Sequence, residues 1–452
     1  MTKLVTNNSV YILTDAPPLR MRGHTKAVQM QYDERYTLYF RRARMLGFVL
    51  QFKRQPPMLV HSALTALIDR WRPERHSFHL TCGEMIVTLE DFSMITALPI
   101  EGHALTGRVE RANWQERVIA LIGDCPPMKG NRTSGVRLKW LLENRSVCPQ
   151  DADQRTVEQY ARAYLWYLLT ELDDVTQRTE DTSGVCGFVW ALSIWMWERL
   201  PVGRPERVRS RAWTDYGEEG DSARYPTVAY AWDKVKVYTG KATTLYKLFS
   251  NDLSIVPQLS FFLTILLLVN WFPYRDREWG FELNSMRKED RLAWRCIVPL
   301  ICVYAVEWHL PQRVATQFGI LQHTPPGKPT DTGGSDLHWK SRKNCQSITD
   351  WGHEHQEYVK MWDERSYRKD SERRVVHWDT YHERHMKWYD DGVKYHVRLR
   401  PQWTDDDISE LEEDDSEDEA YRGRLRDLEG DFREYAPLMN RVVSGVLICF
   451  EP

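Results

Sequence analysis

The sequence predicts a mainly α-helical protein, with a single helical domain, one small β-hairpin near residues 77–89 and an acidic, disordered segment towards the C-terminus. Apolar residues recur three and four positions apart in most segments that can be buried, which is typical of helices. Strand-like residues flank a single glycine-containing turn. Apolar residues make up 42% and charged residues 28% of the 452-residue chain. Both fractions are ordinary for globular proteins, so the chain can bury a core.

The first part of the chain is expected to contain an arm and two helices. Residues 1–30 show no sustained periodicity and are interpreted as a loose N-terminal arm, followed by a core domain over residues 31–325. Apolar residues at helical spacing predict a helix over Tyr36–Phe52, broken at Gly47. A second helix is expected over His61–Trp71, because Pro73 prevents its continuation.

The predicted hairpin leads directly into a helix. Ser77–Leu80 and Met85–Leu89 have strand character and flank a tight turn at Thr81–Glu84, where Gly83 supplies a positive φ. Thr88 is followed three residues later by Asp91, which is the spacing of a capping box. A helix is therefore expected to begin immediately after the hairpin.

The rest of the core is predicted to be helical. Helices are expected over residues 114–122, 136–142, 156–172 and 188–200, and the last is so rich in Trp that it indicates a buried central helix. Arg291–Trp308 is interpreted as a core helix with a kink at Pro299. Leu259–Val269 is strongly apolar but has only eleven residues. A membrane-spanning helix needs about 20, so no membrane association is expected.

Beyond residue 325 the composition becomes polar. Residues 326–347 are interpreted as a linker, 348–400 as an aromatic and charged helical extension, 401–425 as an acidic disordered segment, and 426–452 as a C-terminal segment with one further helix. Eleven of the fifteen residues in Asp405–Glu419 are acidic and none is basic. Subtracting their charge from the net −3 leaves the other 437 residues at +8. The body is therefore mildly basic and the acidic run stays solvated.

No arrangement of residues predicts a catalytic, cofactor or metal site. The eight cysteines lack the spacing of a metal ribbon and are interpreted as buried or incidental thiols in a reducing compartment. His382 and His385 lie three apart without the H-E-x-x-H pattern, and no G-x-S-x-G elbow is present. Gly240-Lys241 lacks the upstream Gly of a phosphate-binding loop. We therefore expect no enzymatic activity and no cofactor.

One basic stretch is a candidate for nucleic-acid binding. Five of the thirteen residues in Arg199–Arg211 are Arg, and the candidate patch within it consists of Arg204, Arg207, Arg209 and Arg211. Clustered Arg favours contacts with phosphate. The alternative is that Arg204 makes a structural contact with helix ends, and the sequence alone leaves both interpretations open.

The sequence from Leu64 to Ile100 (LTALIDRWRPERHSFHLTCGEMIVTLEDFSMITALPI) resembles the plant mobile domain. Trp195–Pro205, Val306–Gly319 and Thr349–Trp351 resemble later blocks of this family in the same order, so that the resemblance covers residues 20 to 395. Two departures from the family pattern stand out. The region near residues 165–190 is shorter, and the apolar insert Leu259–Leu268 separates an Asn-Asp-Leu element from a Trp-x-Pro-Tyr element, here Trp271–Tyr274.

The resemblance implies a nuclear function. The family includes MAINTENANCE OF MERISTEMS-like proteins and phosphatase 7 long-form homologs, and it also occurs in plant transposable elements. It implies a non-catalytic interaction module with roles in transposon silencing, genome integrity and meristem maintenance. The implied partner is a phosphatase 7-like protein phosphatase or another nuclear protein. The aminotransferase-like label of the family does not imply activity here, because the predicted strand content is too small for a pyridoxal-phosphate scaffold. The alternative is a transposon-derived accessory protein that binds nucleic acid directly.

Overall fold

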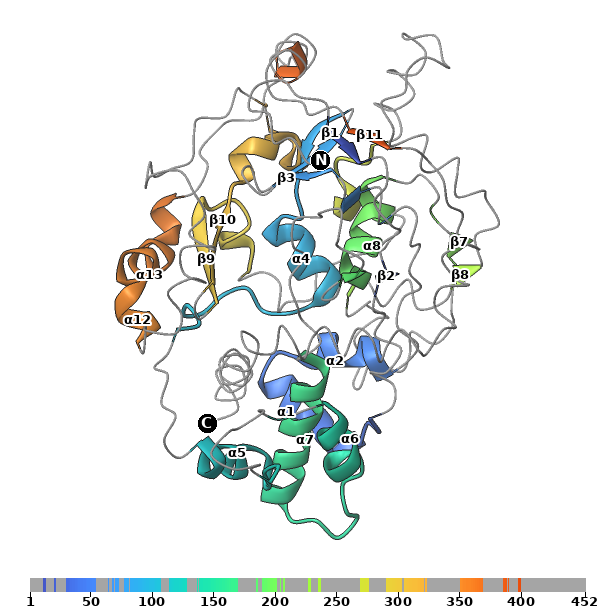
Figure 1. The fold of residues 1–452 in the computed structure, drawn as a ribbon, viewed down its shortest axis with the longest axis vertical. Helices are drawn as coiled ribbons and strands as arrows, with labels where there is room; N and C mark the ends of the chain where they lie inside the picture. The colour runs from blue at the N-terminus through green and yellow to red at the C-terminus, as the bar shows by residue number, and fades with distance from the viewer. Residues whose placement is uncertain are drawn as a thin grey trace.

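The fold was analysed in a computed structural model of the full chain (Figure 1). The residues that the structure describes are 11–13, 20–21, 30–53, 64, 67–68, 70–72, 77–80, 82–106, 114–127, 136, 138–169, 184–185, 189–200, 204, 206–207, 227–228, 235–236, 269–275, 290–302, 305–320, 322, 350–368, 385–387, 389 and 397–399.

The described part of the chain is mainly helical, as predicted. The α-helices are α1 (Thr37–Arg42), α2 (Leu46–Lys53), α4 (Leu89–Thr96), α5 (Trp114–Ile122), α6 (Leu138–Arg145), α7 (Gln154–Leu169), α8 (Val189–Arg199), α12 (Trp351–Glu354) and α13 (Gln356–Asp363). Short 3-10 helices are η2 (Glu34–Tyr36), η6 (Pro273–Arg275), η9 (Asp290–Leu292), η10 (Pro311–Phe318) and η11 (Arg365–Arg368).

The strands are short and form small separate sheets. The strands are β1 (Tyr11–Leu13), β2 (Arg20–Met21), β3 (Trp71–Arg72), β4 (Ser77–Leu80), β5 (Gly83–Met85), β6 (Gly184–Val185), β7 (Glu206–Arg207), β8 (Val235–Lys236), β9 (Val298–Cys302), β10 (Ala305–His309) and β11 (Val397–Leu399). The largest sheet is the antiparallel order β3-β4-β5, and β9 pairs with β10 as a second antiparallel hairpin. Strands β1 and β11, from opposite ends of the chain, pair in parallel.

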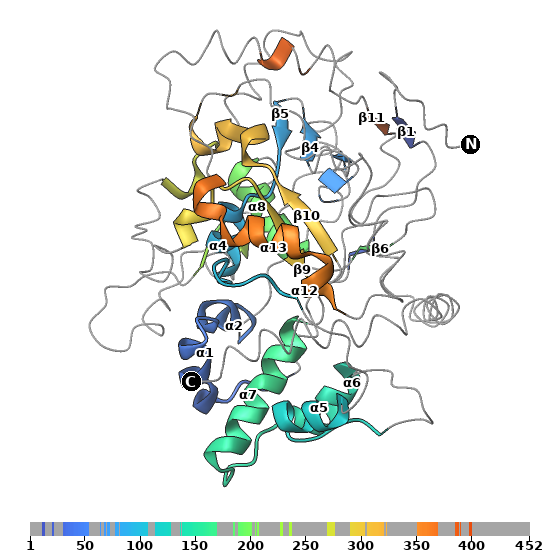
Figure 2. The same ribbon diagram turned by 90° about the vertical axis from the view of Figure 1, so that its left-hand side faces the viewer.

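The helices α1, α2, α5, α6 and α7 gather at one end of the molecule (Figures 1 and 2). Helix α7 is the common element, since α1, α2, α5 and α6 all contact it. Its inner face is aromatic, and Tyr164 packs within 6.1 Å, ring centroid to centroid, of Tyr32, Tyr36 and Phe40. Aromatic rings at these separations hold an amphipathic helix against its neighbours through area burial and edge-to-face contacts.

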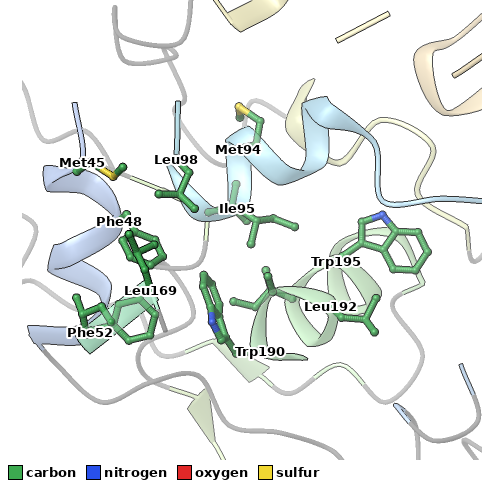
Figure 3. Packing of buried hydrophobic residues seen from close by; sticks show 14 of the residues in the cluster. Met45, Phe48, Phe52, Met94, Ile95, Leu98, Leu169, Trp190, Leu192 and Trp195 are labelled. Atoms are coloured by element: carbon green, nitrogen blue, oxygen red, sulfur yellow. The ribbon is translucent and has the colours of Figure 1, made fainter. Parts of the chain in front are cut away.

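Helices α4 and α8 pack together at the centre of the other group of elements (Figure 1). All eleven residues of α8 are buried, which confirms the predicted central helix. Figure 3 shows Ile95 from α4, Leu98 just after it, Trp190 and Leu192 from α8, and Phe52 from α2 converging in one apolar cluster. The core is therefore continuous between the two groups of helices.

The predicted hairpin and capping box are both confirmed. The hairpin is formed by β4 and β5, with Leu80 opposite Gly83 and Phe78 opposite Met85. The second strand starts at Gly83, two residues earlier than predicted, and β3 adds a third strand. The Thr88 hydroxyl accepts from the backbone N–H of Asp91 at 3.1 Å, while the Asp91 carboxylate accepts from the backbone N–H of Thr88 at 2.9 Å. This reciprocal pair fixes the start of α4.

The predicted kinked helix over Arg291–Trp308 is wrong. The chain forms η9 and then the β9–β10 hairpin, in which Pro299 lies opposite Trp308. An apolar run without clear polar spacing fits a buried strand as well as a buried helix. The β-branched residues Val298 and Ile301 favour the strand, and a proline inside a helix removes a hydrogen bond.

Two other predicted helices have different boundaries. The helix predicted over Tyr36–Phe52 is interrupted between α1 and α2 rather than at Gly47, and Arg44 lies at a left-handed φ of 59° at that break. The helix predicted to reach Trp71 ends earlier, because Trp71 lies in β3 and pairs with Phe78. The strand pairing buries the aromatic ring against a second ring at 4.9 Å, which a helix end does not provide.

Several predictions lie largely outside the described residues. These are the N-terminal arm, the linker 326–347, most of the helical extension 348–400 beyond residue 368, the acidic segment 401–425 and the C-terminal segment 426–452. The first part of the helical extension predicted over 348–400 appears as α12 and α13, separated at His355. None of the described helices is long and apolar enough to cross a membrane.

The φ of +116° at Gly83 gives a first prediction. We expect Gly83→Ala to lower the free energy of unfolding by about 1–3 kcal/mol, because an L-residue is strained in this conformation. A Cβ there would lie 3.6 Å from Met386 Sδ, an ordinary contact, so the cost comes from the backbone and not from a clash. Since this φ lies well beyond the left-handed region that Asn tolerates, Gly83→Asn should be no milder than Gly83→Ala. Urea unfolding measures both; unchanged midpoints would contradict the assignment.

Candidate functional site

The buried carboxylate of Asp91, in the first turn of α4, is the centre of a polar network. Its Oδ2 accepts from the Thr88 hydroxyl at 2.7 Å, in addition to the backbone hydrogen bond of the capping box. Its Oδ1 accepts from the Tyr274 hydroxyl at 2.6 Å and from Arg199 Nε at 2.9 Å. Burial, and then the charge of Asp91, raises the pKa of Tyr274, so this phenol remains a donor.

Arg199, in the last turn of α8, connects four parts of the chain. Besides Asp91, its guanidinium donates through Nη1 to the backbone carbonyls of Trp271 at 2.7 Å and Gln317 at 3.3 Å. The side chains of Asp91 and Arg199 are both 0% exposed. Burial opposes the charge of the guanidinium, but the neighbouring Asp91 and Tyr274 outweigh it, and the pKa of Arg199 is raised. The guanidinium of Arg199 therefore stays charged at every physiological pH.

A second buried pair joins the hairpin to η10. Arg313 donates to Glu84 through Nε at 2.8 Å and through Nη2 at 2.6 Å, the two-point geometry that arginine makes with carboxylates. The Ser77 hydroxyl donates to the same carboxylate at 3.2 Å. His79 Nε2 lies 3.9 Å from Glu84 Oε1. These contacts attach β4 and β5 to a segment more than 200 residues later in the chain.

Two further side chains bind backbone groups of the segment between β5 and α4. The Gln317 amide accepts from the Ile86 N–H at 3.0 Å and donates to the Ile86 carbonyl at 2.9 Å, as a neighbouring strand would. His309 Nε2 accepts from the Leu89 N–H at 3.2 Å, and its Nδ1 lies 2.9 Å from the Cys296 carbonyl. These partners assign the proton of neutral His309 to Nδ1. Burial lowers the pKa of His309 to about 4.

The network brings together the sequence blocks that carry the family resemblance. Asp91 comes from the Leu64–Ile100 block, Arg199 from the Trp195–Pro205 block and Tyr274 from the Trp-x-Pro-Tyr element. The block Val306–Gly319 supplies His309, Arg313 and Gln317. The polar residues of these blocks therefore bind one another, although they lie far apart in the sequence.

The polar groups of this network bind one another. Ser77, His79 and Glu84 are the residue types of a hydrolytic triad, but the Ser77 hydroxyl donates to Glu84. All three residues are at most 3% exposed, so a substrate has no access to them. Nowhere in the described part of the chain do three His, Cys, Asp or Glu residues group as metal ligands do.

Cys82, Cys125, Cys148 and Cys296 are thiols that form no disulfide, and burial suppresses the reactivity of two of them. Cys82, Cys148 and Cys296 are buried and Cys125 is half-buried. Burial raises the pKa of Cys125 to about 11 and also raises the pKa of Cys148. The thiolate is the nucleophilic form of cysteine, so neither thiol is activated.

Of the candidate basic patch, the structure describes the side chain of Arg204 only. Arg204 Nη2 lies 3.8 Å from Glu198 Oε1, and the Glu198 side chain is 1% exposed whereas that of Arg204 is 27% exposed. This contact with the last turn of α8 corresponds to the structural alternative for Arg204. Arg207 lies in β7, and Arg209 and Arg211 lie outside the described residues.

Comparison with known proteins identifies the family. The chain matches the family model described as Plant mobile domain over residues 53–173 and 171–390, and it belongs to this family. The two matched segments meet at residues 171–173, within the region near residues 165–190 that is expected from the sequence to be shortened. No solved structure matches the chain.

Three relatives from Arabidopsis thaliana illustrate the range of the family. The chain is 29% identical over 373 residues to "Serine/threonine-protein phosphatase 7 long form homolog", covering 73% of this chain and 26% of that protein. It is 26% identical over 328 residues to "Protein MAINTENANCE OF MERISTEMS", covering 62% of each. It is 27% identical over 335 residues to "Protein MAIN-LIKE 2", covering 64% of this chain and 46% of the relative. The match spans less than two thirds of each relative's length.

Sequence analysis missed most of the network. The sequence placed Asp91 in the capping box, Glu84 in the hairpin turn and Arg199 in the basic stretch considered for nucleic-acid binding, and it gave no role to Arg313. In the structure Arg199 is buried against Asp91, so it is not available to phosphate. The available signal was the presence of charged residues inside apolar blocks, such as Glu198 and Arg199 at the end of a helix that is otherwise apolar and aromatic. Charged residues in buried positions are usually paired, but the sequence does not say with what.

Breaking the central pair gives the second prediction. We expect Arg199→Met to lower the free energy of unfolding by about 3–5 kcal/mol, because Asp91 remains buried without its counter-charge. Lys139→Met is the control: Lys139 lies 3.7 Å from Glu143 on the surface of α6, and such exposed pairs contribute less than about 1 kcal/mol. Equal urea midpoints for the two variants would contradict a role for the buried network.

The lowered pKa of His309 gives the third prediction. In the unfolded chain the imidazole of His309 has its usual pKa of 6.5, whereas in the folded protein it stays neutral down to about pH 4. The unfolded state therefore binds more protons in this window. The contribution of His309 to the free energy of unfolding is complete above pH 6.5. It falls by about 3 kcal/mol as the pH drops to 4. Urea unfolding between pH 4 and 7 measures this slope, and His309→Gln should reduce it; an equal slope in the variant would contradict the assignment.

Proposed function

We propose that this chain is a non-catalytic interaction module that acts in the nucleus, in transposon silencing, genome integrity and meristem maintenance. Membership of the plant mobile domain family and similarity to a protein named for the maintenance of meristems support the meristem-related part of this role. The proposed partner is a protein phosphatase of the phosphatase 7-like type. The similarity to a relative with that name supports this choice.

The observation that carries the proposal is that the buried polar groups of the described core pair with one another. Asp91 and Arg199, and likewise Glu84 and Arg313, bind each other across the described core. The residues most suited to acid–base or nucleophilic chemistry, Ser77, His79 and His309, are at most 3% exposed. An active site needs such groups at a surface that a substrate reaches. This use of polar residues favours a scaffold whose outer surface binds partners.

The alternative function is a transposon-derived accessory protein that binds nucleic acid directly. The +8 charge outside the acidic run and the Arg-rich stretch at residues 204–211 favour it. Arg204 is paired with Glu198, so Arg207, Arg209 and Arg211 are the residues that would test this alternative without disturbing α8.

Salt dependence separates the two functions and gives the fourth prediction. Binding driven by six or more phosphate contacts falls by roughly 10³-fold or more between 50 and 200 mM salt. A protein interface anchored by buried Trp and Arg side chains loses much less. In a pull-down from nuclear extract we expect a phosphatase-like partner to remain bound at 200 mM salt, while DNA is already weakly retained.

The control is the triple variant Arg207→Ala, Arg209→Ala, Arg211→Ala, which leaves the Arg204–Glu198 contact in place. The partner protein should stay bound to this variant. If the triple variant instead abolishes tight DNA binding and reduces its salt slope, the nucleic-acid function is correct and the proposed function is wrong.

A further inference from the structure

We propose that the acidic run Asp405–Glu419 docks on an arginine face of the same chain, and so covers that face against other polyanions. The arginine face is defined by Arg291 and Leu292 in η9 and by Arg365, Tyr367 and Arg368 in η11. This inference is independent of the proposed function, because it concerns contacts within the chain.

The two parts of the arginine face lie side by side. The backbone N–H of Ile297, just after η9, donates to the Arg368 carbonyl at 3.0 Å. Beneath them, Trp362 packs in one buried cluster with Cys296 and Val298. The hairpin β9–β10 and helix α13 that carry these segments are neighbours in Figures 1 and 2. The face therefore rests on packed elements and has a defined geometry.

Large side chains project from this face into solvent. Tyr367 is 90% exposed and Leu292 is 62% exposed, which makes them two of the five exposed large hydrophobic residues in the described part of the chain. The guanidinium of Arg365 lies 4.9 Å from the centre of the Trp362 ring, and that of Arg291 lies 5.9 Å from the Trp294 ring. Stacking holds the two arginines in place, and Tyr and Arg are the residues that anchor interfaces.

The arginines of this face have no carboxylate partner. No ion pair involves Arg291, Arg365 or Arg368 in the described part of the chain. Two acidic residues at the end of α13 lie near other partners: Glu364 is 3.9 Å from Lys360, and Asp363 is 4.0 Å from His103. The face therefore presents unneutralised positive charge beside exposed apolar groups.

The acidic run matches this face in charge and is tethered close to it. Eleven acidic residues without a basic one complement a cluster of arginines, and Ile408 and Leu411 within the run complement Tyr367 and Leu292. Strand β11 ends at Leu399, five residues before the run. Residues 400–419 reach up to about 70 Å when extended. A compact domain of this length has a radius of gyration of about 22 Å, so the run reaches the face from β11.

Tethering favours the run over an external ligand. A segment attached through a short linker has an effective concentration in the millimolar range. Nucleic acid or an acidic segment of another protein would have to displace it. Docking of the run therefore raises the affinity that any competing polyanion needs in order to occupy the arginine face.

A peptide-binding experiment tests the proposal. The probe is a fluorescein-labelled peptide of residues 403–421, titrated by anisotropy at 50 mM salt with two forms of the full chain. One form is intact, and in the other all eleven acidic residues of the run are replaced by Asn or Gln. We expect the peptide to bind the neutralised chain at least about tenfold more tightly than the intact chain, because the intact chain occupies its own site.

The triple variant Arg291→Gln, Arg365→Gln, Arg368→Gln, made in the neutralised chain, should weaken peptide binding at least about tenfold. The matched control replaces three exposed arginines of the helical group, Arg42, Arg117 and Arg155, and should leave binding unchanged. Thermal unfolding midpoints equal to that of the parent establish that both variants fold.

Three results would overturn the proposal. If both triple variants weaken peptide binding equally, the arginine face is not the docking site. If the intact chain binds the peptide as tightly as the neutralised chain, the face is open to an external acidic partner. If the neutralised chain binds duplex DNA through the three arginines but not the peptide, the occupant of the face is nucleic acid.

Discussion

The rest of the described core depends on the ion pair between Asp91 and Arg199. Neither charge is tolerable at its position alone, since both side chains are 0% exposed. The pair fixes α4 against α8, and the remaining donors of Arg199 hold the backbone at Trp271 and Gln317. Four chain segments that are remote in sequence must therefore be in their native positions before the buried polar groups of any one of them are all hydrogen-bonded.

Buried ion pairs contribute less to net stability than their distances suggest, because removing two charges from water offsets most of their attraction. Their effect here is on geometry. An apolar core of Trp, Tyr and Phe tolerates several packing arrangements of similar volume. Only one arrangement allows both the two-point contact between Arg313 and Glu84 and the hydrogen bonds between Gln317 and Ile86. The aromatic core thus supplies the driving force, and the polar network selects the arrangement.

The sequence predicted those features that depend on neighbouring residues. The capping box at Thr88 and Asp91, the turn at Gly83 and the central helix over 188–200 all follow from spacings of a few residues. The β9–β10 hairpin was not predicted, since an apolar run carries no periodicity to separate strand from helix. The polar network was not predicted either, because its partners are 108 residues apart for Asp91 and Arg199 and 229 for Glu84 and Arg313. No local pattern records such a pairing.

The long separation between Glu84 and Arg313 has a consequence for synthesis of the chain. Translation proceeds at roughly 5–20 residues per second, so Arg313 emerges about 10 to 50 s after Glu84. During that interval the hairpin cannot bury its carboxylate with the native partner. The helical group formed by α1, α2, α5, α6 and α7 is complete by Leu169, and its helices contact one another through α7, although Phe52 of α2 also packs against Trp190 of α8. On the ribosome this group can assemble first. The elements β4, β5 and α4 reach their native contacts only after the second half of the domain, which carries their partners, has been synthesised.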